Sequence, residues 1–323
     1  RLLPAQNLWN ILSIPKESFS KKISAPVASA VFYLLVSQLC FILLLTIVTS
    51  LVLMQGKDRG QANQIINDIS YQYMFIVYSV GAIFTLLVSW IADHAFARDQ
   101  EFWRHGWRFW ELPVEARLEF WRGSGTGLAV PIVVLVLLQI SGQINYLGTF
   151  VTSDTRSPIF FLFLANALAL AAMLLCEEFI FRHKIPGALR LNISPFGSAV
   201  LTSIGYVIVK HFQFSLALLD YVSLFFVSLA SGFFYLRTGR IFRGMGFLGT
   251  LFGAVHFVCG LNLWGHNTPG LFLFTDSKTA LSTITGGIDG PLAGLAMTSV
   301  LAIITVSSYL MWTRSDAIPS TKR

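Results

Sequence analysis

Long apolar runs constrain this chain more than any other feature. About eight of them approach the roughly 20 residues that a helix needs to cross the ~30 Å hydrocarbon layer of a bilayer. Lipid offers the backbone no hydrogen-bond partners, so spans of this kind are helical. Of the 323 residues, 54% are apolar and only 12% are charged, a balance that a water-exposed globule does not tolerate. The sequence therefore predicts an all-α, polytopic transmembrane helical bundle.

The predicted spans and their flanking charges indicate an orientation. The spans are 28–54, 71–93, 125–143, 158–182, 196–213, 216–236, 243–260 and 291–312. Most Lys and Arg residues fall on the side that holds the N-terminus. The opposite side carries only Lys57, Arg59, Arg156, Lys210 and Lys278. By the positive-inside rule, both termini are predicted to be cytoplasmic in a multi-pass protein of the cell (inner) membrane.

The chain divides into four predicted regions. They are a cytoplasmic N-terminal segment (1–27), an N-terminal transmembrane region (28–157), a core that carries the chemistry (158–270), and a loop with the last span and a short tail (271–323).

Residues 95–122 of the second region predict an interfacial helix. Trp103, Trp107 and Trp110 recur there at helical spacing, with arginines beside them. Such a helix would place its rings at the level of the lipid headgroups. Its expected role is a membrane-surface anchor, with substrate gathering as the alternative.

The basic charge and the cysteines indicate no further class of protein. The formal net charge is +7, but the basic residues are scattered between apolar runs and form no clustered face for nucleic acid. Cys40, Cys176 and Cys259 lie in or beside apolar runs, without the paired spacing of a zinc site or a disulfide framework. We expect reduced thiols in the core and no nucleic-acid partner.

Ionisable side chains within the predicted spans are the main indication of chemistry, because such groups are costly in lipid unless they are paired or hydrated. The fourth span contains Glu177 and Glu178, and Arg182 follows Glu178 by one helical turn. Glu178 and Arg182 share a helix face and are expected to pair. Glu177 is then the free carboxylate. The structural alternative is a salt bridge that anchors the end of the span.

Two histidines are predicted to lie at a depth similar to that of Glu177. His211 ends the fifth span, and His256 lies within the apolar run of the seventh. One carboxylate and two imidazoles are enough to activate a water, with Glu177 as general base and the histidines aligning the water and stabilising the oxyanion. Alternatively, His211 could extend to the headgroups beside Lys210, and His256 could be a buried structural residue.

These residues resemble the CAAX protease and bacteriocin-processing family of intramembrane proteases, which includes the type II CAAX prenyl endopeptidase. The string Glu177-Glu178-Phe-Ile-Phe-Arg182 matches the family motif EExxxR. The histidine of the family motif FxxxH corresponds to His211 in the fifth span. The histidine of HxxxN corresponds to His256 in the seventh. The resemblance covers about residues 158–270.

The resemblance implies a function for each of these side chains. Glu177 and His211 would activate the attacking water, and His256 would steady the oxyanion. Glu178 and Arg182 would be structural support. The implied activity is that of an intramembrane endopeptidase acting on a peptide or membrane protein, and the sequence does not show whether that substrate is prenylated.

Two positions depart from the family pattern. Val207 stands at the Phe of FxxxH, and Gly260 stands at the Asn of HxxxN, where it provides no side-chain donor. Asn262 could replace that donor only if the helix ends near Gly260 and the chain turns back. Loss of one oxyanion donor typically lowers kcat by about 10²–10³-fold. A non-catalytic membrane scaffold or immunity-type protein on the same fold is therefore the alternative function.

Metal chemistry and transport are further alternatives. One glutamate and two histidines could hold zinc, but the chain lacks HExxH, so the prediction is a site without metal or cofactor. A Glu and His chain could also relay protons in a coupled transporter, although the sequence shows no inverted repeat or broken helix typical of carriers. The expected partners are the substrate and the lipid bilayer, and the oligomeric state is left open.

Overall fold

The protein is described by a computed structural model that covers residues 16–55, 59–95, 114–149, 157–189, 193–214, 216–264 and 270–316. The described chain is mostly helical, which confirms the all-α prediction. In order, its elements are α2 (Lys16–Met54), α3 (Arg59–Ala95), α5 (Val114–Ile140), β1 (Ile144–Thr149), α6 (Ser157–Glu178), a π-helical segment (Phe179–Lys184), α7 (Ile185–Leu189), α8 (Pro195–Gln213), α9 (Leu218–Thr238), α10 (Phe242–Gly253), a second π-helical segment (Ala254–Val258), β2 (Phe272–Asp276), α11 (Ser282–Thr285), 3-10 turns at Gly287–Asp289 and Pro291–Ala293, and α12 (Leu295–Asp316).

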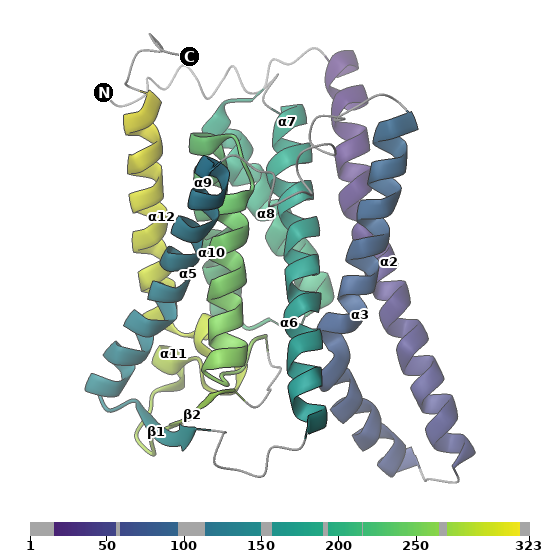
Figure 1. Ribbon diagram of the computed structural model, residues 1–323, viewed down its shortest axis with the longest axis vertical. Coiled ribbons are helices and arrows are strands. Elements are labelled where there is room, and N and C mark those ends of the chain that lie inside the picture. Colours follow the sequence, from purple (N-terminus) through teal and green to yellow (C-terminus); the bar gives the residue numbers. More distant parts are fainter. Residues whose placement is uncertain are drawn as a thin grey trace.

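Six helices in the described ranges are long and apolar enough to cross a membrane. They are Val27–Met54, Phe75–His94, Val114–Ile140, Phe163–Leu189, Leu218–Thr238 and Leu295–Arg314. A shorter apolar helix covers Phe242–Val258, and α8, which contains Lys210 and His211, is not among the six. The helices run side by side, and α2 begins at the same end of the bundle at which α12 ends (Figure 1). These features fit an integral membrane protein, but the predicted count of eight spans is not confirmed.

The region of the predicted interfacial helix is only partly described. Residues 96–113, which include Trp103, Trp107 and Trp110, lie outside the described residues. The remainder, from Val114, forms the first turns of α5, which continues past Pro131 to Ile140. The described helix therefore begins well before the predicted span boundary at residue 125. Its polar first turns are tied to α10 by Glu119, whose carboxylate accepts a hydrogen bond from Arg243 at 3.1 Å.

Glycines allow α5 and α10 to approach closely. A Cβ placed on Gly127 would overlap the main-chain oxygen of Phe247, and a Cβ placed on Gly246 would overlap that of Phe120. Thr250 adds a hydrogen bond from its hydroxyl to the Ser124 carbonyl at 2.9 Å. Small residues that let two backbones approach are a main source of helix association in lipid. This contact holds α10 in place behind the candidate site.

We expect Gly127→Ala to destabilise the protein by about 1–3 kcal/mol, because the added methyl group forces the two backbones apart. Gly125→Ala is the matched control on the same helix, since a Cβ there meets nothing within 4 Å, and its expected effect is a gain of at most about 1 kcal/mol in helix propensity. Thermal unfolding of both variants in the same detergent measures the difference. Equal melting temperatures would contradict the proposed role of the close contact.

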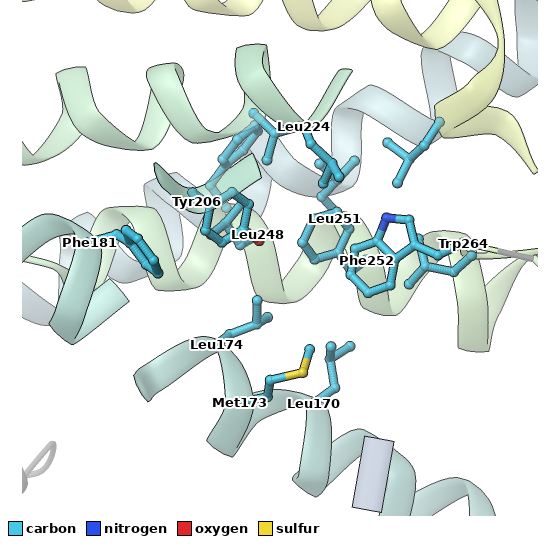
Figure 2. Packing of buried hydrophobic residues seen from close by; sticks show 14 of the residues in the cluster. Leu170, Met173, Leu174, Phe181, Tyr206, Leu224, Leu248, Leu251, Phe252 and Trp264 are labelled. Carbon is cyan, nitrogen blue, oxygen red and sulfur yellow. The ribbon is translucent and has the colours of Figure 1, made fainter. Parts of the chain in front are cut away.

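The apolar core fixes α6 against α10. Buried side chains of α6 face those of α10, and Trp264 lies at one side of the same cluster (Figure 2). The labelled residues of α6 and α10 are Leu170, Met173, Leu174, Leu248, Leu251 and Phe252. Cys176 and Cys259 are buried with free thiols, and Cys40 is half-buried. This packing sets the direction in which the polar residues after Leu174 point.

At the end of the bundle opposite the start of α2, β1 and β2 form a two-stranded antiparallel sheet (Figure 1). Ile144 pairs with Asp276, and the register shifts between Tyr146 and Gly148. Together with the turns near residues 285–291, β2 borders a cavity of about 280 Å³.

Candidate functional site

The two sequence segments that carry the candidate site both depart from α-helical geometry. α6 passes into a π-helical segment directly after Glu178, and Arg182 lies within that segment. α10 passes into another that contains His256. π-helical turns are rare and are frequently found at functional sites.

Glu177 lies at the meeting point of three helices. It is 1% exposed. Its Oε1 atom accepts a hydrogen bond from the Tyr33 hydroxyl of α2 at 2.9 Å and another from the Lys210 ammonium of α8 at 2.6 Å. The free carboxylate predicted from the sequence is thus a member of a buried ion pair.

Lys210, and not His211, faces Glu177. The Lys210 side chain is fully buried, whereas His211 is exposed with its Nδ1 atom 2.8 Å from the hydroxyl of Tyr221. Consecutive residues on an α-helix point about 100° apart, so only one of the two can meet α6. The structure therefore does not bring the predicted partner His211 to Glu177.

Three aromatic rings also lie close to the Lys210 ammonium. Its Nζ atom lies 5.4 Å from the ring centre of Tyr206, 5.1 Å from that of Phe214 and 4.8 Å from that of Trp264. Cation–π contacts of this length stabilise a charge that has lost its water. Tyr206 precedes Lys210 by one turn, as Val207 precedes His211, so the aromatic and basic pair lies one residue earlier than predicted.

Glu178 and Arg182 form a second buried polar group on the neighbouring face of the same segment. The Arg182 Nε atom lies 3.5 Å from a Glu178 oxygen, as the spacing predicted, and both side chains are 1% exposed. Ser231 donates to Glu178, and Arg182 donates to Ser228 at 2.5 Å. Gly244 of α10 packs against Glu178 so closely that a Cβ there would overlap the carboxylate. This pair connects α6 to α9 and α10.

His256 is buried, and Leu261 and Phe75 are among its neighbours. It is 1% exposed, and its Nδ1 atom lies 3.4 Å from the Leu261 carbonyl. Its ring packs against Phe75 with 5.2 Å between ring centres, and Phe75 also contacts Trp264 at 6.3 Å. Because Trp264 covers Lys210, a series of ring contacts connects His256 to the ion pair.

Asn262 is placed where it faces away from the candidate site. The helix ends at Val258, and Gly260 turns the chain with φ +58°. The helix end near Gly260 that Asn262 would need in order to act as a donor is therefore present. The Asn262 amide, however, donates to the Ile288 carbonyl at 2.5 Å and lines the cavity beside β2. The structure does not place Asn262 as an oxyanion donor at Glu177.

No group of three or more His, Cys, Asp and Glu side chains that could hold a metal ion occurs among the residues that the structure describes. Comparison with known proteins finds no matching family model, no matching curated protein and no matching solved structure. The resemblance to CAAX proteases therefore depends on the quoted residues.

Proposed function

We propose that the protein is an intramembrane endopeptidase of the CAAX-processing type, in which Glu177 activates the attacking water. The observation that supports this most is the state of its second oxygen. Glu177 Oε2 is buried and has no hydrogen-bond partner in the described chain. The Tyr206 hydroxyl is close to the same carboxylate but also lacks a hydrogen bond of good geometry within the described protein. A water that contacts both Glu177 Oε2 and the Tyr206 hydroxyl would be oriented for attack.

The surrounding donors suit the remaining steps of peptide hydrolysis. Tyr33 and Lys210 hold Oε1, which leaves Oε2 to take the proton of the water as its oxygen attacks the scissile carbonyl carbon. The Lys210 ammonium would stabilise the oxyanion, since donors in a site without bulk water act strongly on developing charge. Collapse of the tetrahedral intermediate breaks the C–N bond, and the leaving amine takes the proton from Glu177. In this mechanism Lys210 stabilises the oxyanion, the role that the family resemblance implied for His256.

The topology belongs to the same proposal. We infer eight crossings, with α8 and α10 as the two additional ones, in a cell (inner) membrane with both termini cytoplasmic. The uneven distribution of Lys and Arg supports this orientation. Lys210 is one of the five basic residues assigned to the non-cytoplasmic side. Because it is buried against Glu177, it does not contribute to the charge of that side. The substrate would be a peptide or a membrane protein.

The function is tested by cleavage of a membrane-peptide library by purified protein in lipid. Glu177→Gln should lower kcat by at least about 10²-fold, because it removes the general base. This substitution also leaves Lys210 without a counter-charge, so Glu177→Gln/Lys210→Met serves as the folded, neutral and inactive comparison. Glu119→Gln, at the polar start of α5, should retain activity. Cleavage that persists in Glu177→Gln would contradict the proposal.

A non-catalytic scaffold is the second candidate, and the buried ion pair favours it specifically. Lys210 neutralises Glu177 at 2.6 Å, and a neutralised carboxylate is a weaker base. If this function holds, the wild type cleaves no member of the library. The neutral double variant then retains the same thermal stability and the same protein partners as the wild type.

A further inference from the structure

Buried polar side chains line the contact between α2 and α8 next to the ion pair. Tyr33 of α2 donates to Glu177, and the Gln213 amide of α8 is close to the same hydroxyl without a hydrogen bond of good geometry. The α2–α8 polar seam is our term for the side chains of Tyr33, Gln213, Tyr206 and Glu177.

The seam contains several polar atoms whose hydrogen-bonding capacity is not met within the described chain. They are both amide atoms of Gln213, the Tyr206 hydroxyl and Glu177 Oε2. None of these side chains is more than 6% exposed. Each such group costs about 1–3 kcal/mol if it stays unsatisfied, and native proteins satisfy almost all buried polar groups with protein or ordered water.

The chemistry of these atoms fits water. A buried water needs two to four polar partners, and the seam offers donors and acceptors together: Gln213 provides both, and Glu177 provides an acceptor. A metal cation fits less well, because the Lys210 ammonium already lies 2.6 Å from the carboxylate and would repel a second positive charge.

The seam leads from Glu177 to the end of α8. α8 ends at Gln213, where the Tyr78 hydroxyl donates to the Gln213 carbonyl at 2.7 Å and the half-buried Gln38 donates to the Phe212 carbonyl at 2.5 Å. This end therefore carries polar groups from α2, α3 and α8, whereas apolar side chains cover the outward faces of these helices. A path for water would enter there.

We propose that the α2–α8 polar seam holds exchangeable waters that reach Glu177 from the Gln213 end of α8. The role of this path rests on the proposed function, since a hydrolase within a membrane consumes water at every turnover. The presence of the waters does not depend on catalysis, and it is measured without substrate.

X-ray radiolysis of the full-length protein in lipid nanodiscs tests the path, because hydroxyl radicals formed from bound water label the side chains beside it. Tyr33 and Tyr206, both at most 1% exposed, should be labelled well above Phe247, which is equally buried in the apolar core. After brief mixing with H₂¹⁸O, the label should carry ¹⁸O. Labelling of both tyrosines at the level of Phe247, or label without ¹⁸O, would overturn the proposal.

A pair of variants assigns the waters to the seam. Gln213→Leu should reduce labelling of Tyr33 to the level of Phe247. Ser223→Ala should leave it unchanged, since the Ser223 hydroxyl is bonded to the Leu292 carbonyl away from the seam. Unchanged Tyr33 labelling in a folded Gln213→Leu protein would refute the path. Labelled tyrosines in a protein that cleaves nothing would reject the proposed function but leave the waters in place.

Discussion

Lys210→Met is expected to lower the free energy of unfolding by about 3–5 kcal/mol, because it leaves the Glu177 carboxylate buried without its counter-charge. The two side chains are 0% and 1% exposed and lie 2.6 Å apart, so the few waters that could reach them do not replace the lost ion pair. Methionine has a similar length and flexibility, which keeps the added effect of packing small. Unfolding in detergent, followed by tryptophan fluorescence, measures the loss.

Two comparisons separate charge from packing. Lys210→Met/Glu177→Gln removes both charges and should recover most of the loss, since a neutral buried pair leaves no isolated ion. Lys184→Met removes a partner of Asp93, where the side chains are 13% and 8% exposed, and should cost less because this pair is less completely buried. A double variant as unstable as Lys210→Met would show that charge is not the cause.

Arg182→Met is expected to cost a similar amount, about 3–5 kcal/mol, for the same reason. The guanidinium is fully buried. It lies 3.5 Å from Glu178 and donates to Ser228 and to the Phe181 carbonyl. Its removal leaves Glu178 with the Ser231 hydroxyl as its remaining neighbour of known geometry. The same unfolding measurement applies.

Arg122→Met is the matched control for this prediction. Arg122 pairs with Glu119 at 2.6 Å, but its side chain is 55% exposed, and exposed pairs contribute about 0–1 kcal/mol. Arg182→Lys should recover only part of the stability, because a lysine cannot reproduce the several directed donors of a guanidinium. Equal losses in Arg182→Met and Arg122→Met would contradict the role assigned to the buried pair.

Local patterns in the sequence predicted the features that depend on a single helix. Apolar runs gave the helical class, and the spacing of Glu178 and Arg182 gave their ion pair. The sequence could not show that Lys210, and not His211, lies against Glu177, because that depends on which face of α8 meets α6. Both residues end the same apolar run, and no local pattern distinguishes them.

Other contributors to the site carried no sequence signal. Tyr33 lies in the predicted first span, outside the region of family resemblance, and is separated from Glu177 by 144 positions in the chain. Its contact exists only because α2 packs beside α6 and α8. The indole of Trp264 lies over Lys210, and Trp264 itself has a left-handed backbone at φ 55°, a conformation that is not evident from composition.

The two π-helical segments give α6 and α10 a change of helical phase within one span. A π-helical turn accommodates about one residue more than an α-helical turn, and one residue corresponds to about 100° around the axis. A single helical wheel therefore cannot assign the faces of side chains both before Phe179 and after Lys184. A sequence aligned to this chain without that segment needs a one-residue gap there, or every lipid-facing position beyond it is assigned to the wrong face.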